Sequence, residues 1–260
     1  MEAQPAVVTV RFNKFLPYWA VLQTDLRQTF RSWVYRLWVL ITVLSAAGFL
    51  VYRVGLHKDA GLFVSAASHC ADLFRIIVMG SLALIVVLGV SSIGSEKGSV
   101  ADSVLSRGIS RHQYFLAKWH ARLVVVAVTF AGLGALVLTA SYFLFKSDGE
   151  TDLSLVGGLA AVVAVCAVLV AIVSWGVTIG ALTNTILGIT IFWLALYGSG
   201  FLMTLLPEPW PSPDRELGKL RHILRGQFST SLLTDVVGAA VAASGLAAVI
   251  GLIGFSRRDV

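Results

Sequence analysis

The chain has 260 residues, of which 57% are hydrophobic and only 13% are charged, and its mean hydropathy is +0.84. A soluble globular domain carries about 25% charged residues, so this chain has too little polar surface to cover a water-soluble sphere of its size. The composition excludes a soluble enzyme, a disordered protein and a nucleic-acid-binding domain despite a net charge of +6, and it favours a polytopic membrane protein.

Apolar runs predict six membrane-spanning helices, because about 20 apolar residues are needed to cross a bilayer. One uncharged run, 153–207, has 55 residues and is too long for a single crossing. The polar residues Thr183, Asn184 and Thr185 mark where this run turns back. We expect an all-α integral membrane protein with one transmembrane domain over 1–260 and spans at 37–56, 75–95, 122–145, 153–182, 185–206 and 233–255.

An even number of spans places both termini on one side, and the basic residues choose that side. The side that holds both termini and the loop between spans two and three carries 12 bases and 5 acids, whereas the other side carries 8 bases and 9 acids. We therefore expect both termini in the cytoplasm, although this topology places the basic segment 215–225 outside.

The segment 17–33, before the first span, has the pattern of an amphipathic helix. Tyr18, Leu22, Leu26 and Phe30 recur at intervals of four, and Asp25, Arg27, Gln28 and Arg31 are polar. The pattern predicts an interfacial helix on the cytoplasmic side. The alternative is an N-terminal extension of the first span.

The loop 96–119, between spans two and three, holds two helix-start signals. Ser99 and Asp102 begin a predicted short helix over 100–106, and Ser110 with Gln113 forms a capping box that begins a second helix at Arg111. The short helix is predicted to have an apolar face. We expect either that this face docks on a partner protein or that the loop rests on the membrane.

The segment 207–230 opens with four prolines and continues with leucine and isoleucine at helical spacing. We expect a short extracytoplasmic helix that lines a substrate exit or caps the bundle.

Catalytic and metal-binding patterns are absent from the sequence. The five histidines are scattered, Cys70 and Cys166 lie far apart, and no phosphate-binding glycine loop occurs, so this chain is expected to be no enzyme and to bind no cofactor or metal. The scarcity of charge within the spans weakens the assignment to the class of ion-coupled transporters. An integral-membrane enzyme would have to use the one modest polar cluster, which fits a helix break better: Ser174, Thr178, Asn184 and Thr185.

Small residues mark two helices for close packing. Gly176 and Gly180 form a GxxxG pair in span four, and Gly238, Ala242 and Gly245 follow one another in span six. These residues serve helix packing within one protomer or a homodimer seam.

The loop and tail motifs resemble those of a known family. Glu96-Lys97-Gly98-Ser99 precedes Leu105-Ser106-Arg107-Gly108-Ile109-Ser110-Arg111, and Lys118 follows seven residues later. With the tail Phe255-Ser256-Arg257-Arg258-Asp259 and the plan of six spans after an interfacial helix, the chain resembles the permease subunit of type-two ABC exporters.

The resemblance implies that the loop 96–119 is a cytoplasmic coupling segment that contacts a separate ATPase subunit. The residues implied in coupling are Glu96, Gly98, Asp102, Val104, Leu105, Arg107, Arg111 and Lys118. ATP and Mg would be bound by two copies of that ATPase, and a second permease copy would complete a homodimer in a bacterial cytoplasmic membrane.

The implied function is export, or force transmission, driven by the partner's ATP hydrolysis. Membrane lipid and an extracytoplasmic accessory protein are further expected partners, and nucleic acid is not. The alternative is a non-transporting membrane scaffold or a subunit of a maturation complex.

Overall fold

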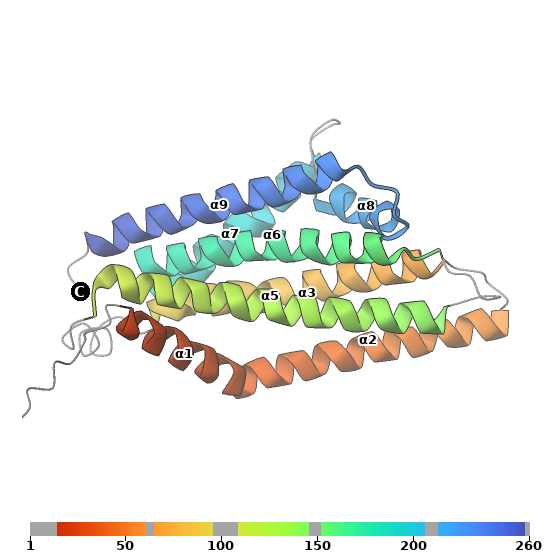
Figure 1. Cartoon of the computed structure of the whole chain (residues 1–260), viewed down its shortest axis with the longest axis horizontal. Helices are drawn as coiled ribbons and strands as arrows, with labels where there is room; N and C mark the ends of the chain where they lie inside the picture. Colours follow the sequence, from red (N-terminus) through yellow and green to blue (C-terminus); the bar gives the residue numbers. More distant parts are fainter. Residues whose placement is uncertain (1–14, 61–64, 96–108, 146–151, 206–212, 258–260) are drawn as a thin grey trace, which may run out of the picture.

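The computed structural model describes residues 15–60, 65–95, 109–145, 152–205 and 213–257, and every regular element within these ranges is an α-helix (Figure 1). In chain order the helices are α1 (Leu16–Arg31), α2 (Trp33–Ala60), α3 (Ala66–Gly94), α5 (Arg111–Leu144), α6 (Leu155–Leu182), α7 (Thr185–Leu205), α8 (Pro213–Leu224) and α9 (Thr230–Ser256).

Six of these helices, α2, α3, α5, α6, α7 and α9, are long and apolar enough to cross a membrane. The all-α class expected from the sequence is thereby confirmed, with six candidate membrane spans. Two helices begin well before the predicted spans: α3 begins at Ala66, where Ser65 caps it, and α5 begins at Arg111. With 34 residues, α5 is about 51 Å long, far more than the roughly 30 Å of hydrocarbon that a membrane-spanning helix crosses.

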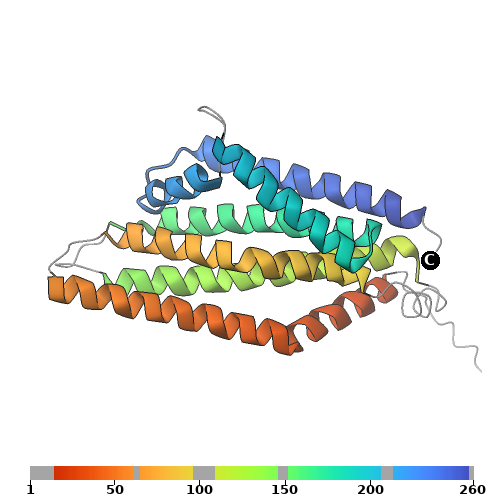
Figure 2. The same cartoon turned by 180° about the vertical axis from the view of Figure 1, so that it is seen from behind.

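The centre of the bundle is α6, which packs against α3, α5, α7, α8 and α9. Figure 1 shows α2, α3, α5, α6 and α9 running along the long axis, and Figure 2 shows α7 crossing them obliquely. The main core cluster lies between α3, α5 and α6, with residues such as Phe74, Phe130 and Leu169. Of the six spanning helices, α2 and α7 are the least buried.

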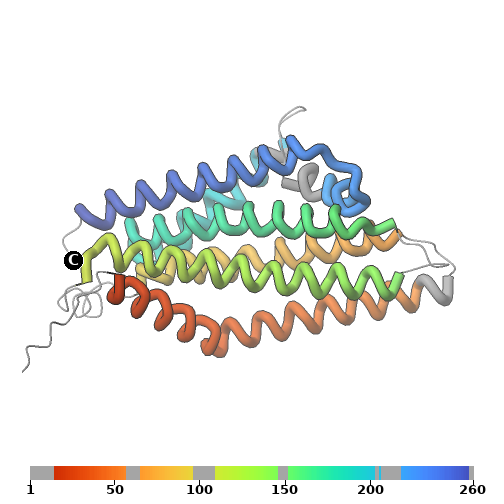
Figure 3. Tube along the Cα trace, viewed as in Figure 1, coloured from red at the N-terminus to blue at the C-terminus, as the bar shows by residue number. Residues whose placement is uncertain are grey.

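The start of α1 and the end of α9 lie at the same end of the bundle (Figure 3). We call this the α1 end; α3 also finishes there and α5 begins there. The opposite end, where α8 lies, is called the α8 end. The expected coupling helix at 100–106 falls outside the described residues.

The first helix is separate from the first span. Ser32 between α1 and α2 has an extended backbone (φ −63°, ψ 136°), so α1 bends away from α2 and does not continue it as one straight helix. The buried residues of α1 are Leu22, Asp25 and Thr29. The sequence analysis counted Asp25 among the polar residues, but the structure turns its side chain toward α5.

At the α8 end, α8 covers the ends of α3 and α6. Asp152 joins three elements there: it accepts hydrogen bonds from the Ala67 amide at 3.2 Å and from Arg225 Nε at 3.1 Å. Partial burial alone would raise the pKa of Asp152, but the hydrogen bonds from Ala67, Ser65 and Arg225 and the charge of Arg225 together hold it below its usual value. This arrangement makes α8 a cap on the bundle.

Glycines allow a close approach between α3 and α6. A Cβ atom added at Gly89 would lie 3.1 Å from the Cα atom of Gly176, and one added at Gly180 would overlap the carbonyl oxygen of Val90. The GxxxG pair in α6 therefore packs against α3 within the same chain.

We predict opposite stability effects for two glycine-to-alanine changes. Gly180→Ala forces α3 and α6 apart and should lower the free energy of unfolding by about 1–3 kcal/mol, the usual cost of overpacking. Gly132→Ala in α5, at an exposed site with open space around the glycine, should be neutral or stabilising because alanine favours the helix. Thermal unfolding of both variants in detergent micelles measures the difference, and equal melting temperatures would contradict the α3–α6 contact.

Candidate coupling site

Most of the residues implied in coupling lie outside the described part of the chain: Glu96, Gly98, Asp102, Val104, Leu105 and Arg107. The structure describes the other two, Arg111 and Lys118, both in the first three turns of α5. These turns form the part of α5 that begins at the α1 end.

Arg111 is the first residue of α5. The predicted capping box is confirmed, because Ser110 Oγ accepts a hydrogen bond from the Gln113 amide at 3.2 Å and Gln113 Oε1 accepts one from the Ser110 amide at 3.3 Å. Arg111 Nη1 donates to the carbonyl oxygen of Ser256 at 3.5 Å. The start of α5 is thus fixed in direction by its cap and tied to the end of α9.

Lys118 points into the protein. Its Nζ lies 2.8 Å from Asp25 Oδ1 on α1, and Arg122 Nη2 lies 3.3 Å from the same oxygen. Arg122 Nη1 also donates to Thr29 Oγ1, and Thr29 Oγ1 donates to the carbonyl oxygen of Asp25 at 2.8 Å. We call Asp25, Lys118 and Arg122 the Asp25 triad.

The sequence of α5 explains how the triad forms. Lys118 and Arg122 are four residues apart, so both lie on one face of the helix. The neighbouring residues Ala117 and Ala121 are fully buried against Leu22 of α1. Because alanine side chains are small, the backbone of α1 comes close enough for the short Asp25 side chain to reach both cations.

The triad is buried and carries more positive than negative charge. Asp25, Lys118 and Arg122 are 3%, 4% and 9% exposed, respectively, and two cations share one carboxylate. Two further atoms of the triad, Asp25 Oδ2 and Arg122 Nε, are buried without a hydrogen-bond partner. Charges removed from water in this way are costly unless they stay paired, so the triad holds α1 against α5 in one position.

Two contacts on either side of the triad extend the attachment to α5. Tyr18 Oη lies 3.1 Å from His120 Nδ1, and Tyr35 Oη lies 2.7 Å from Thr129 Oγ1. Tyr18 belongs to α1 and Tyr35 to the first turn of α2. Polar contacts to α5 are therefore made before Asp25 by Tyr18, at Asp25 itself, and after the bend by Tyr35.

Two members of this site, Asp25 and Arg122, were not predicted from the sequence. Asp25 was expected only as a polar residue of the amphipathic helix, and Arg122 only as one of the basic residues of the cytoplasmic side. One signal was present: 18, 22, 25 and 29 follow a helical spacing as regularly as 18, 22, 26 and 30, and the first set contains the only acid between Glu2 and Asp59.

The small residues predicted to serve helix packing or a homodimer seam lie in two different environments. Gly176 and Gly180 face α3, whereas Gly238, Ala242 and Gly245 lie exposed on α9, and neither glycine there has a described neighbour that an added Cβ would touch.

The polar side chains considered for an enzyme site form hydrogen bonds to the backbone of the helices. Ser174 and Thr178 donate to the carbonyl oxygens of Val170 and Ala247, and Asn184 accepts the Leu187 amide at the start of α7. In the described ranges, no group of three or more His, Cys, Asp or Glu side chains could hold a metal ion.

No protein-family model matches this chain, and no curated protein matches it. A function for this chain is therefore inferred from the geometry of the bundle and the motifs in the sequence.

We predict that Asp25→Asn destabilises the protein by about 3–5 kcal/mol, because it leaves two buried cations without their counter-charge. Thr24→Ala, at the exposed neighbouring position, is the matched control and should change stability by less than about 0.5 kcal/mol. Chemical denaturation in detergent, followed by tryptophan fluorescence, measures both.

A second variant separates charge from packing. Replacing the whole triad by apolar side chains, as Asp25→Leu, Lys118→Met and Arg122→Met, should recover most of the stability that Asp25→Asn loses. A triple variant that is less stable than Asp25→Asn would contradict the electrostatic explanation.

Proposed function

We propose that this chain is the permease subunit of an ABC transporter, in which a separate ATPase subunit drives export or transmits force across the membrane. The observation that carries the proposal is the attachment of α1 to the first turns of α5 by the Asp25 triad, directly after the loop that resembles a coupling segment. A membrane protein moved by an external motor needs a rigid element between the motor's contact and its spans, and this attachment supplies one.

The start of α5 is the first part of this transmission element. The loop 96–108 leads into the capped N-terminus at Ser110, and Arg111 links that point to α9. A push on the loop is passed to a 34-residue helix that projects beyond the hydrocarbon and crosses the whole bundle.

The Asp25 triad is the second part. Since Lys118 and Arg122 both hold Asp25, a tilt of α5 carries α1 with it, and α1 in turn pulls on α2 through the bend at Ser32. Rigid-body tilting of packed helices is a common form of conformational switching. In this proposal Lys118 acts by holding α1, and the ATPase contacts come from the loop and from Arg111.

A second permease copy would complete the path. The exposed small residues Gly238, Ala242 and Gly245 on α9 allow another helix to approach closely, so we place the homodimer seam there. Gly176 and Gly180 are already occupied by α3. With both termini in the cytoplasm of a bacterial cell, the ATPase pair would lie at the α1 end.

Affinity purification from native membranes in mild detergent, with mass spectrometry and an ATP hydrolysis assay, tests the proposal. We expect an ABC-type ATPase in equal stoichiometry with this chain. Arg111→Glu combined with Leu105→Asp should abolish that association, because it removes an apolar contact and reverses a charge in the segment that docks.

The control variant is Arg221→Glu, a charge reversal at an exposed position near the α8 end, which should leave the association unchanged. A purified homo-oligomer without ATPase would contradict the proposal and favour the scaffold. Full co-purification with the double variant would show that the ATPase docks elsewhere.

A further inference from the structure

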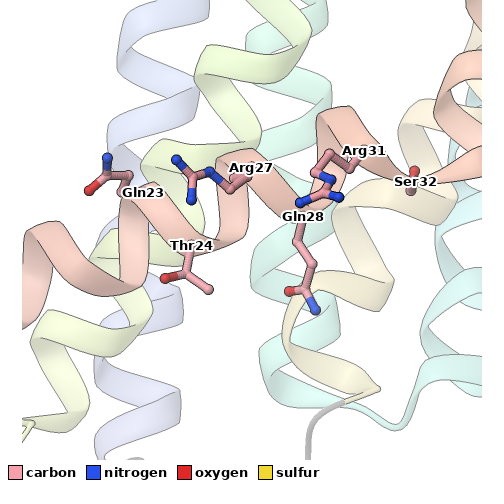
Figure 4. A pocket seen from close by; sticks show the side chains of 6 residues that line it. All are labelled: Gln23, Thr24, Arg27, Gln28, Arg31 and Ser32. Atoms are coloured by element: carbon pink, nitrogen blue, oxygen red, sulfur yellow. The ribbon is translucent and has the colours of Figure 1, made fainter.

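The exposed face of α1 carries an open pocket of about 650 Å³. Its described lining consists of Gln23, Thr24, Arg27, Gln28, Arg31 and Ser32, and Figure 4 shows these side chains on α1 and, for Ser32, at the bend that follows it, with the bundle behind. We propose that this pocket binds the phosphate-bearing headgroup of an anionic phospholipid. The proposal requires a membrane protein but does not depend on the ABC transporter function.

The lining of the pocket is rich in hydrogen-bond donors and positive charge. The six side chains offer two guanidinium groups, two amides and two hydroxyls, and none is a carboxylate. Arginine forks match phosphate oxygens with two parallel hydrogen bonds, and amide and hydroxyl donors complete such a site. The ligand class that fits a set rich in donors with two positive charges is an anion with several acceptor oxygens.

Within the described part of the chain, both arginines lack an acidic partner. None of the ion pairs in the described part of the chain includes Arg27 or Arg31. The one acid of α1, Asp25, is turned away from them and is already shared by two cations. Arg27 and Arg31 are also four residues apart, where like charges repel each other, so a bound anion relieves that repulsion.

The surroundings of the pocket favour an anion that is part of a lipid. Directly after Ser32, the exposed apolar residues at the start of α2 are Trp33, Val34 and Leu37, with Arg36 exposed among them, and Trp33 is 74% exposed. Exposed tryptophan at the start of a spanning helix marks the headgroup level of a membrane. The pocket thus offers a place for a charged head beside an apolar wall for acyl chains, and an amphiphile satisfies both at once.

A free phosphate or an acidic protein segment would satisfy only the charged part. Ser32 lines the pocket, and the exposed apolar start of α2 follows it directly in the chain. Since the apolar wall belongs to a helix that enters the hydrocarbon, the occupant we commit to is an anionic phospholipid of the leaflet next to α1.

Native mass spectrometry of the purified full chain, titrated with phosphatidylglycerol, phosphatidylcholine or inorganic phosphate, tests the proposal. We expect phosphatidylglycerol to bind several-fold more tightly than phosphatidylcholine. Arg27→Gln with Arg31→Gln should weaken phosphatidylglycerol binding by about 25-fold, since each arginine near an anionic lipid contributes about fivefold. Phosphatidylcholine binding should change little.

The matched control removes the same charge elsewhere. Arg221→Gln with Arg257→Gln neutralises two exposed arginines outside the pocket, one near each end of the bundle, and should leave phosphatidylglycerol binding within about twofold of the wild-type value. Both double variants change exposed positions, so their melting temperatures should match that of the wild type.

Three results would overturn the proposal. Equal losses in the two double variants would show only a general effect of net charge. Inorganic phosphate that competes as well as phosphatidylglycerol would show a site without acyl-chain contact. Unchanged lipid binding in Arg27→Gln with Arg31→Gln, together with loss of a co-purifying protein, would assign the pocket to a protein partner.

Discussion

A carboxylate buried between two cations is the constraint on which the arrangement of the first two helices depends. Asp25 is almost fully removed from water, and so are Lys118 and Arg122. Breaking such a set leaves unpaired charge in the protein, which costs far more than breaking an exposed ion pair. The α1 helix packs mainly on α5 and much less on α2, and the charged set adds to the apolar contact of Leu22 with Ala117 and Ala121 in holding it there.

The same constraint separates the two faces of α1. Asp25, the only acid of α1, points toward α5 and pairs with two cations there. The outward face of α1 therefore keeps Arg27 and Arg31 without a counter-charge in the described structure. One face therefore serves attachment within the chain, and the other is available for an anion from outside. The proposed lipid site and the proposed coupling role are two consequences of where one carboxylate points, although each is tested separately.

Much of the fold was predictable from the sequence, because the signals were local. Apolar runs predicted six spanning helices, Thr183 to Thr185 marked the turn between α6 and α7, and the capping box at Ser110 began α5 at Arg111. The early start of α3 was not predicted, because the charged residues near the start of this helix are typical of a loop. The Asp25 triad was not predicted because Asp25 and Lys118 are 93 residues apart in the chain. The sequence of α1 is also compatible with two different buried faces, and it does not show which of them packs against α5.

The central claim is that the Asp25 triad fixes α1 on α5, and a distance distribution between the two helices tests it most directly. Spin labels at Thr24→Cys and Val128→Cys, both exposed positions, would be measured in lipid nanodiscs after Cys70 and Cys166 are replaced by alanine. We predict one narrow distribution in the otherwise native chain and a broad one when Asp25→Asn is added. A distribution that stays equally narrow with Asp25→Asn would contradict the account, because other contacts would then suffice to hold α1.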